Sequence, residues 1–306
     1  MKKKEERIYG IIVCIVLIVC FIYKTSIVND VKKVSANISD NTTTTTTKRV
    51  IVDGMLEVHI LDVGQADSIL ITTGDSNMLI DAGNNEDGKK IVSYIKSLNI
   101  DSFDYVVGTH PHEDHIGGMD DVIKEFNINN YMMPEKLSTS KTFEDVLDAL
   151  LEKNLSYTVP KINSEYTLGD AIIKIIYIGD DSNNANDSSI VIKLIYGENS
   201  FLFMADASTS VEKKILNSDI QSDVLKLGHH GSEYSTSDVF LQKVNPKYAA
   251  VSVGKNNIYD HPKKVTLDKL NSKNIKVYRT DLDGTIIFKT DGKTIDVKTI
   301  NTDTNG

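Results

Sequence analysis

The chain opens on one long apolar run, from Ile8 to Tyr23, which follows a short basic segment. This run is slightly shorter than the roughly 17–25 residues of a usual membrane-spanning helix, but flanking residues can snorkel to cover the difference. We therefore predict a transmembrane anchor at residues 8–23 and a cytoplasmic basic tail at residues 1–7, since basic residues favour the inner side of a membrane. The alternative is secretion after removal of a signal peptide. The small-residue site Val34–Ala36 stands too far beyond the apolar run for a typical one.

Residues 24–50 show no repeating apolar pattern and include the threonine run Thr42–Thr47. Such a segment cannot bury enough apolar surface to fold, so it is predicted to be an exposed linker. The folded body is expected at residues 51–295, and residues 296–306 are expected to be a polar tail.

From Met55 onward, strand-like and helix-like patterns alternate along the chain. Apolar residues recur at helical spacing in residues 91–98 and 265–270. Strand-like runs are predicted at residues 58–63, 68–72, 78–81, 105–107, 190–196, 201–204, 224–227, 249–253, around 277 and at 286–288. Residues Gly197–Asn199 between two of these runs predict a hairpin. Mixed strands with interspersed helices predict an α/β fold of two sheets covered by helices.

Charge is unevenly spread along the sequence. The net charge is −9, but the first 50 residues hold nine basic and four acidic residues, which leaves the remainder at −14. A body this acidic has no general attraction for nucleic acid, because polyanion binding depends on clustered Lys and Arg. Both cysteines, Cys14 and Cys20, lie in the apolar run, so any metal in the body must be held by His, Asp and Glu.

The segment from Thr109 to Gly118 is the most informative one in the chain. It places four potential metal ligands directly after a buried-strand pattern, and these are His110, His112, Asp114 and His115. His110 and His112 could hold one metal while Asp114 and His115 face a second. Imidazole and carboxylate ligands suit zinc, manganese or iron. Gly117 and Gly118 allow a tight turn afterwards. The alternative, a solvated loop that is merely rich in histidine, has little support because histidine is scarce elsewhere in the chain.

These residues resemble the HxHxDH signature of the metallo-β-lactamase superfamily. Leu79–Gly83 is similar to the superfamily's first motif, and the resemblance implies that Asp81 supports the metal loop. Asp206, which closes a strand-like run, stands where the family has an aspartate that bridges two metals. The resemblance implies a four-layer αββα sandwich and two divalent metal ions, Zn or Mn.

More narrowly, the chain resembles the extracellular hydrolase domain of the ComEC competence-protein family. The matching segments are Asp62–Ser68, Asn186–Val191, Leu227–Ser232 and Tyr259–Pro262. Two departures matter. No histidine lies between His115 and Asp206, so either one metal has fewer protein ligands or His229 fills the place. The sequence has one apolar segment where the competence proteins carry many membrane helices, so it is not expected to form a DNA channel.

Four further histidines lie outside the metal-binding motif. Neighbouring side chains at a strand end point in opposite directions, so one of His229 and His230 is expected to bind metal while the other orients it or meets substrate. We favour His229 as the ligand and give His230 the catalytic role. His261 is either a final ligand or an ordinary turn histidine before Pro262, and His59 within the opening strand is interpreted as structural.

Three polar residues are candidates for positions behind the metal or against the substrate. Asp67 could contact substrate or metal, although a loop-capping role after Gly64 is favoured. Asn186 and Ser189 could reach the site, although such an Asn-rich stretch is more often simply a loop.

The leading hypothesis is a membrane-anchored, extracytoplasmic metal-dependent hydrolase that cleaves a phosphodiester with activated water. Asp114 would be both a ligand and the acceptor of the water's proton. The substrate would be nucleic acid, a small nucleotide or a cell-envelope ester, with six lysines able to line a basic groove: Lys136, Lys141, Lys226, Lys255, Lys263 and Lys264. The alternatives are a lactam, lactone or thioester hydrolase, or a non-catalytic metal-stabilised binding module. The membrane is the expected partner of the N-terminal helix, and no protein partner is inferable.

Overall fold

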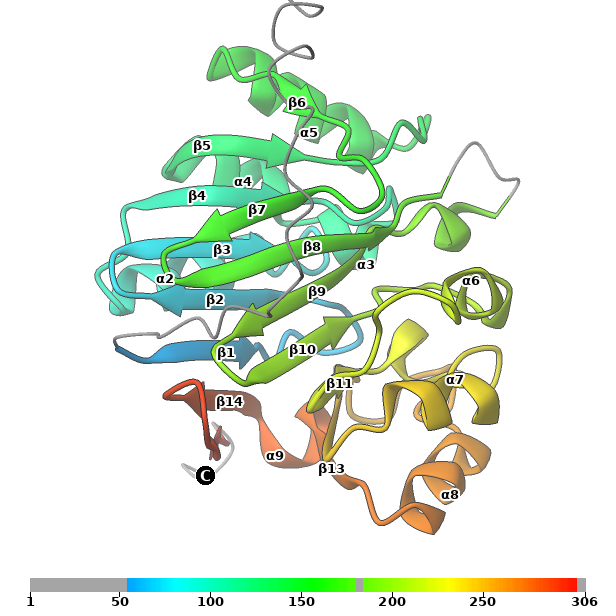
Figure 1. Ribbon diagram of the computed structural model, residues 1–306. Helices are drawn as coiled ribbons and strands as arrows, with labels where there is room; N and C mark the ends of the chain where they lie inside the picture. The colour runs from blue at the N-terminus through cyan, green and yellow to red at the C-terminus, as the bar shows by residue number, and fades with distance from the viewer. Residues whose placement is uncertain (1–53, 180–183, 302–306) are drawn as a thin grey trace, which may run out of the picture. The chain divides into compact units, whose positions relative to one another are not determined.

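The computed structural model describes residues 54–179 and 184–301, and Figure 1 shows how its strands and helices are arranged. The predicted basic tail, anchor and linker at residues 1–50 lie outside the described residues. Within the described ranges, no helix combines the length and the apolar character that crossing a membrane requires.

The first sheet has eight strands in the order β15-β14-β1-β2-β3-β4-β5-β6, of which β3 to β6 run parallel. Its strands are β1 (Leu56–Ile60), β2 (Ile69–Thr73), β3 (Ser76–Ile80), β4 (Ser102–Val107), β5 (Asn127–Met132), β6 (Tyr157–Thr158), β14 (Thr285–Thr290) and β15 (Ile295–Ile300).

The second sheet has seven strands in the order β13-β12-β11-β10-β9-β8-β7, of which β10 to β13 run parallel. Its strands are β7 (Glu165–Leu168), β8 (Ala171–Tyr177), β9 (Val191–Tyr196), β10 (Asn199–Phe203), β11 (Val224–Lys226), β12 (Tyr248–Val251) and β13 (Lys276–Arg279). Tyr196 pairs with Asn199 across the predicted hairpin, so the turn is Gly197-Glu198. Gly197 has a φ of 60° there, a conformation that suits glycine.

Helices cover the outer face of each sheet. Those on the first sheet are α2 (Gly88–Ser97), α3 (Glu113–Ile116), α4 (Met119–Glu125) and α5 (Lys141–Glu152). Those on the second are α6 (Thr209–Ile215), α7 (Asp238–Val244) and α8 (Lys264–Ser272). The short helix α9 (Thr280–Asp283) joins β13 to β14. Serine side chains at Ser140, Ser208 and Ser237 accept hydrogen bonds from the first turns of α5, α6 and α7, which fixes where these helices begin.

Three apolar cores hold the layers together, and strand alternation explains how. In β2, Ile69 and Ile71 lie in the core between the two sheets, whereas Leu70 lies in the core under the helices of the first sheet. A third core packs the second sheet against α6, α7 and α8. The predicted α/β sandwich of two helix-covered sheets is therefore confirmed.

One predicted boundary is wrong. Residues 296–306 were expected to be a polar tail, but residues 295–300 form β15, which pairs antiparallel with β14. The reason is the alternation of this segment: Ile295 and Val297 pack against the inter-sheet core, while Asp296 between them is exposed.

Candidate metal centre

The histidine motif and the later candidate residues meet at one edge of the sandwich. Asp81 follows β3, the histidine motif follows β4, Asp206 follows β10, and His229 and His230 follow β11. Since β3 and β4 are parallel, and so are β10 and β11, the segments after these strands leave each sheet at a common edge. The fold therefore gathers side chains that are far apart in the sequence.

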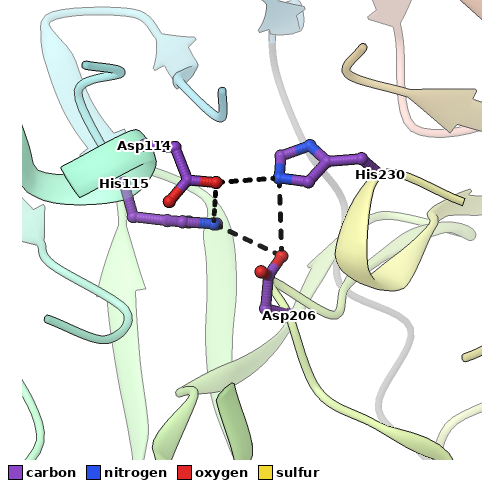
Figure 2. A group of neighbouring side chains, drawn as sticks. All are labelled: Asp114, His115, Asp206 and His230. Atoms are coloured by element: carbon purple, nitrogen blue, oxygen red, sulfur yellow. Dashed lines mark hydrogen bonds and ion pairs between the residues drawn. The ribbon is translucent and has the colours of Figure 1, made fainter. Parts of the chain in front are cut away.

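Figure 2 shows a first group of ligand-type atoms, made by Asp114, His115, Asp206 and His230. His230 Nε2 lies 3.2 Å from Asp114 Oδ2 and 3.8 Å from Asp206 Oδ1. His115 Nε2 lies 3.3 Å from Asp206 Oδ1 and 3.9 Å from Asp114 Oδ2. Two imidazole nitrogens and two carboxylate oxygens thus surround one point.

A second group consists of His110, His112 and Asp206. His110 Nε2 lies 3.1 Å from His112 Nδ1 and 3.9 Å from Asp206 Oδ2. Asp206 therefore turns Oδ1 toward the first group and Oδ2 toward the second. The role that the family resemblance implied for Asp206 requires this arrangement, in which one carboxylate joins two ligand groups.

Outer partners direct the lone pairs of three imidazoles toward the centre. Asp81 Oδ2 accepts from His115 Nδ1 at 2.7 Å and from the Thr109 hydroxyl at 2.7 Å. Thr109 Oγ1 in turn lies 3.2 Å from His110 Nδ1, and the Ser252 carbonyl lies 2.9 Å from His230 Nδ1. With each Nδ1 donating its proton outward, each Nε2 is left as an acceptor for a metal. Asp81 thus lies where the sequence expected it, behind the metal loop.

The charges of this centre favour a cation. Burial alone would keep His115 and His230 neutral, but Asp206 and its neighbouring carboxylates outweigh it and raise the pKa of both imidazoles. Burial would likewise raise the pKa of Asp206, but the facing imidazoles hold it well below its ordinary value. The buried carboxylates that raise these pKa values would equally stabilise a divalent cation.

The individual ligand atoms also fit a metal. His115 Nε2 and Asp206 Oδ1 are buried and make no well-aligned hydrogen bond among the described residues. Burial holds the pKa of His110 well below its ordinary value, so this imidazole is neutral, the form that binds metal. The residues present therefore fit divalent cations with imidazole and carboxylate ligands.

Gly117 and Gly118 serve close packing rather than an unusual turn. A Cβ on Gly117 would lie 2.2 Å from the backbone of Asn84, and one on Gly118 would lie 2.5 Å from the Ala82 carbonyl oxygen. Both residues have negative φ. The metal loop can therefore lie directly against the segment that carries Asp81.

The two adjacent histidines do not alternate as a strand end would require. They lie in the 3-10 turn η2 (Gly228–Gly231), with φ of 48° at His229 and 52° at His230. This left-handed backbone brings His230 into the first ligand group and leaves His229 partly exposed, with its Nε2 3.7 Å from Asp206 Oδ2. The geometry thus reverses the preference for His229 as the ligand, since His230 is the better placed of the two.

His261 lies beside this pair without joining either ligand group. Its ring is 5.7 Å from the His229 ring and 6.5 Å from the His230 ring. Burial, together with His230 and His229, lowers the pKa of His261 to about 4.

Asp67 is not a loop cap, contrary to the favoured interpretation. Its side chain is buried, and Oδ2 forms an ion pair with the buried Lys226 Nζ at 2.9 Å. Oδ1 lies 3.7 Å from His230 Nδ1, and the Asp67 backbone donates to the Asp114 carbonyl at 2.9 Å. Lys226 was expected to line a basic groove, not to pair with Asp67 inside the protein. Its place within the apolar run Val224–Leu227 was the signal for this pair, because a charge in a buried strand needs a partner.

Of the remaining candidates, Ser189 forms a hydrogen bond within the centre, whereas Asn186 and His59 form none there among the described residues. Ser189 is buried, and its Oγ accepts from the Asp206 backbone N–H at 3.2 Å, which helps to hold the bridging aspartate. Asn186 lies in the short turn η1 (Ala185–Ser188), and no hydrogen bond or ion pair between described residues joins its side chain to the centre. His59 is structural as expected: its Nδ1 is 2.7 Å from the Tyr94 hydroxyl and its Nε2 is 3.1 Å from Glu57.

Three of the six lysines expected to line a groove are engaged elsewhere. Lys226 is inside the protein, Lys141 pairs with Asp145, and Lys264 pairs with Asp268, each of the last two within its own helix. Lys136 does lie near the centre, since it lines a small apolar cavity together with His110. A groove built from all six lysines is therefore excluded.

Comparison with known proteins agrees with this geometry. Residues 61–255 match the family profile of the Metallo-beta-lactamase superfamily. The chain is 30% identical to ComE operon protein 3 of Bacillus subtilis, over 76% of this chain and 33% of that protein. It is also 30% identical to Competence protein ComA of Neisseria gonorrhoeae, over 76% of this chain and 32% of that protein. The chain thus spans about a third of the length of these curated relatives.

The crystal structure of the metallo-beta-lactamase fold protein YhfI from Bacillus subtilis superimposes with a TM-score of 0.55. It covers 78% of this chain and 100% of that one at 12% identity, a likeness that concerns the fold alone. The family match, the two-sheet sandwich and the competence-protein relatives together show that this chain belongs to the metallo-β-lactamase superfamily of metal-dependent hydrolase-like domains and that its relatives are ComEC-type competence proteins.

Proposed function

We propose that this protein hydrolyses a phosphodiester bond with the help of two divalent cations, zinc or manganese. The observation that carries the proposal is the bridging position of Asp206, with one oxygen toward each ligand group. Bound there, the cations would polarise a phosphoryl oxygen and lower the pKa of the attacking water.

The chain's own residues divide the remaining work. His110 and His112 would hold one cation, Asp114, His115 and His230 would hold the other, and Asp206 would contribute to both groups. Asp81 and the Ser252 carbonyl keep His115 and His230 in the orientation that ligation needs. The partly exposed Asp114 is a ligand that also lies open to solvent, and we assign it the proton of the attacking water.

We further propose that residues 8–23 anchor this domain in the membrane and that the domain lies on the outer side. The support is the apolar run behind a basic segment. The net charge of −14 beyond residue 50 and the engagement of Lys141, Lys226 and Lys264 favour a small or local phosphodiester over a long polyanion.

The full-length protein, loaded with manganese or zinc, tests this proposal on single-stranded DNA and on a small chromogenic phosphodiester across a salt series. We expect cleavage of the small ester to vary little with ionic strength and to be lost in Asp114→Asn. DNA cleavage that is rapid at low salt and collapses at high salt would contradict our view of the acidic surface. No cleavage of either substrate at full metal loading would reject a phosphodiesterase in favour of lactam, lactone or thioester hydrolysis.

A further inference from the structure

A short turn beside the metal centre exposes two apolar side chains. The Asp260 N–H donates to the Asn257 carbonyl at 3.2 Å, so Ile258 and Tyr259 occupy the two central positions of a β-turn. Ile258 is 91% exposed and Tyr259 is 57% exposed. Neither side chain contributes to a core, so the fold itself does not explain why they are apolar.

The turn is held in place by side-chain bonds to the backbone. Asn257 Nδ2 donates to the Gly254 carbonyl at 3.0 Å and to the His261 carbonyl at 2.7 Å, while Asn257 Oδ1 accepts from the His261 N–H at 2.9 Å. At the start of the loop, Gln65 Oε1 accepts from the Gly254 N–H at 3.1 Å. Gln65 stands two residues before Asp67, so this bond ties the turn to a segment of the centre. These bonds hold the backbone of the turn that carries Tyr259.

Tyr259 continues a series of rings that leads outward from the ligands. Its ring lies 5.7 Å from the His261 ring with only 24° between their planes. His261 lies in turn 5.7 Å from the His229 ring and 6.5 Å from the His230 ring. One flat, solvent-accessible aromatic ring thus stands at the rim of the centre, about two ring separations from the ligand His230.

We propose, on the basis of the proposed phosphodiesterase function, that Tyr259 is a stacking platform for a nucleobase of the substrate. A base carries a flat π-face of similar size, and stacking on an aromatic side chain tolerates any base. The phosphodiester would then lie at the metal centre with its attached nucleoside extending toward the turn. The substrate class is accordingly a nucleotide or a nucleic-acid end rather than a simple alkyl phosphodiester.

A lipid surface is the competing occupant for exposed Ile258 and Tyr259, and charge disfavours it. The side chain of Asp260, the next residue, is 98% exposed. The body beyond residue 50 carries a net charge of −14. Both features oppose contact of the turn with an anionic bilayer, because like charges repel. A nucleotide would bring its negative charge to the metal centre and only its neutral base to the turn.

The test compares a thymidine dinucleotide with its analogue in which hydrogen replaces both bases, using the full-length protein loaded with manganese. Stacking is worth about 1–3 kcal/mol per base, so we expect wild-type kcat/KM to be about 5–150-fold higher for the dinucleotide. In Tyr259→Ala this ratio should fall toward one, and in Tyr259→Phe it should persist because the ring remains. Tyr157→Ala removes a 40% exposed tyrosine from β6 and should keep the wild-type ratio.

Equilibrium binding separates this inference from the proposed function. Calorimetry would measure thymidine 5′-monophosphate against deoxyribose 5-phosphate in the same proteins, and Tyr259→Ala should selectively weaken the former. Selective weakening without any cleavage of the dinucleotide would support the platform while rejecting the phosphodiesterase. The stacking role of Tyr259 would be rejected if Tyr259→Ala lost equal affinity for both ligands. It would also be rejected if the wild type showed no preference for the ligand that carries a base. Weaker binding of phospholipid vesicles by Tyr259→Ala, with unchanged nucleotide binding, would likewise reject the stacking role.

Discussion

Lys226 Nζ lies 2.9 Å from Asp67 Oδ2, and both side chains are almost completely buried. The pair joins β11 of the second sheet to the loop that follows β1 of the first. Burial would raise the pKa of Asp67, but Lys226 and His230 outweigh it and lower that pKa. The two charges therefore depend on each other, and they lie directly behind His230.

Breaking this pair from one side should destabilise the protein strongly. Lys226→Met leaves the Asp67 carboxylate without its partner, and such a loss costs about 3–5 kcal/mol in the free energy of unfolding. Adding Asp67→Asn removes the orphaned charge, so the double variant should recover much of that loss. Denaturant unfolding measures both. The control Lys247→Met breaks an ion pair whose lysine is 72% exposed, which should cost about 0–1 kcal/mol. Equal losses in Lys226→Met and Lys247→Met would contradict the expectation.

Asp81 should govern metal affinity through His115. In Asp81→Asn, an amide N–H can lie opposite His115 Nδ1, where the wild type has an oxygen. An amide N–H cannot accept a hydrogen bond from Nδ1, so the imidazole would carry its proton on Nε2 instead. We expect metal affinity to fall by about 10–100-fold with the fold retained. Competition against a chromogenic chelator gives the affinity, and far-ultraviolet circular dichroism checks the fold. Asp75→Asn, in the exposed turn between β2 and β3, is the control, and an Asp81→Asn affinity equal to that of this control would refute the role.

The sequence predicted the local part of the centre well and the long-range part poorly. His110, His112, Asp114 and His115 stand within six residues after a strand, so chain geometry alone gathers them. The partner of Asp67, by contrast, is 159 residues away, and nothing but the tertiary fold brings Lys226 to it. The choice between His229 and His230 rests on two left-handed residues, a conformation that the sequence pattern did not reveal.

The fold likewise includes strands that the sequence predicted and strands that it did not. The strands β9 and β10 and the hairpin between them were predicted because their side chains are buried on one or both faces. The equally apolar strand β8 was not predicted. The edge strand β15 was missed because Asp296 and Lys298 give it a polar composition, although Ile295 and Val297 between them carry the alternation. A half-buried edge strand has too few apolar positions to stand out from a tail.

Replacing the bridging Asp206 should lower the bound metal content per chain more than replacing a ligand that belongs to one group only. Asp206→Ala takes an oxygen from both groups, whereas His112→Ala takes a nitrogen from the second group only. We expect about two metal equivalents per chain in wild type, about one in His112→Ala, and less than one in Asp206→Ala. Elemental analysis after dialysis gives these numbers, and His59→Gln, outside the centre, should match wild type. Identical metal content in the Asp206 and His112 variants would argue against a bridge.

His59 should make part of the stability depend on pH in the mildly acidic range. Burial lowers its pKa below the ordinary value, and the opposing attraction of Glu57 only partly offsets this. Because the folded-state pKa is lower than the unfolded one, protons bind the unfolded chain more tightly. The contribution is therefore fully present above about pH 6.5 and is lost as the pH falls through the folded-state pKa.

His59→Phe removes this titration, so the free energy of unfolding should fall less between about pH 7.5 and pH 5 in the variant than in wild type. Tyr94→Phe is the matched control, because it removes the hydroxyl that bonds His59 Nδ1 but leaves an imidazole to titrate. Denaturant unfolding with a chelator present excludes metal loss as the cause of any difference. The acidic groups that do not contact His59 cancel between wild type and variant. Parallel pH profiles for wild type and His59→Phe would mean that His59 is no more difficult to protonate in the folded protein than in the unfolded chain.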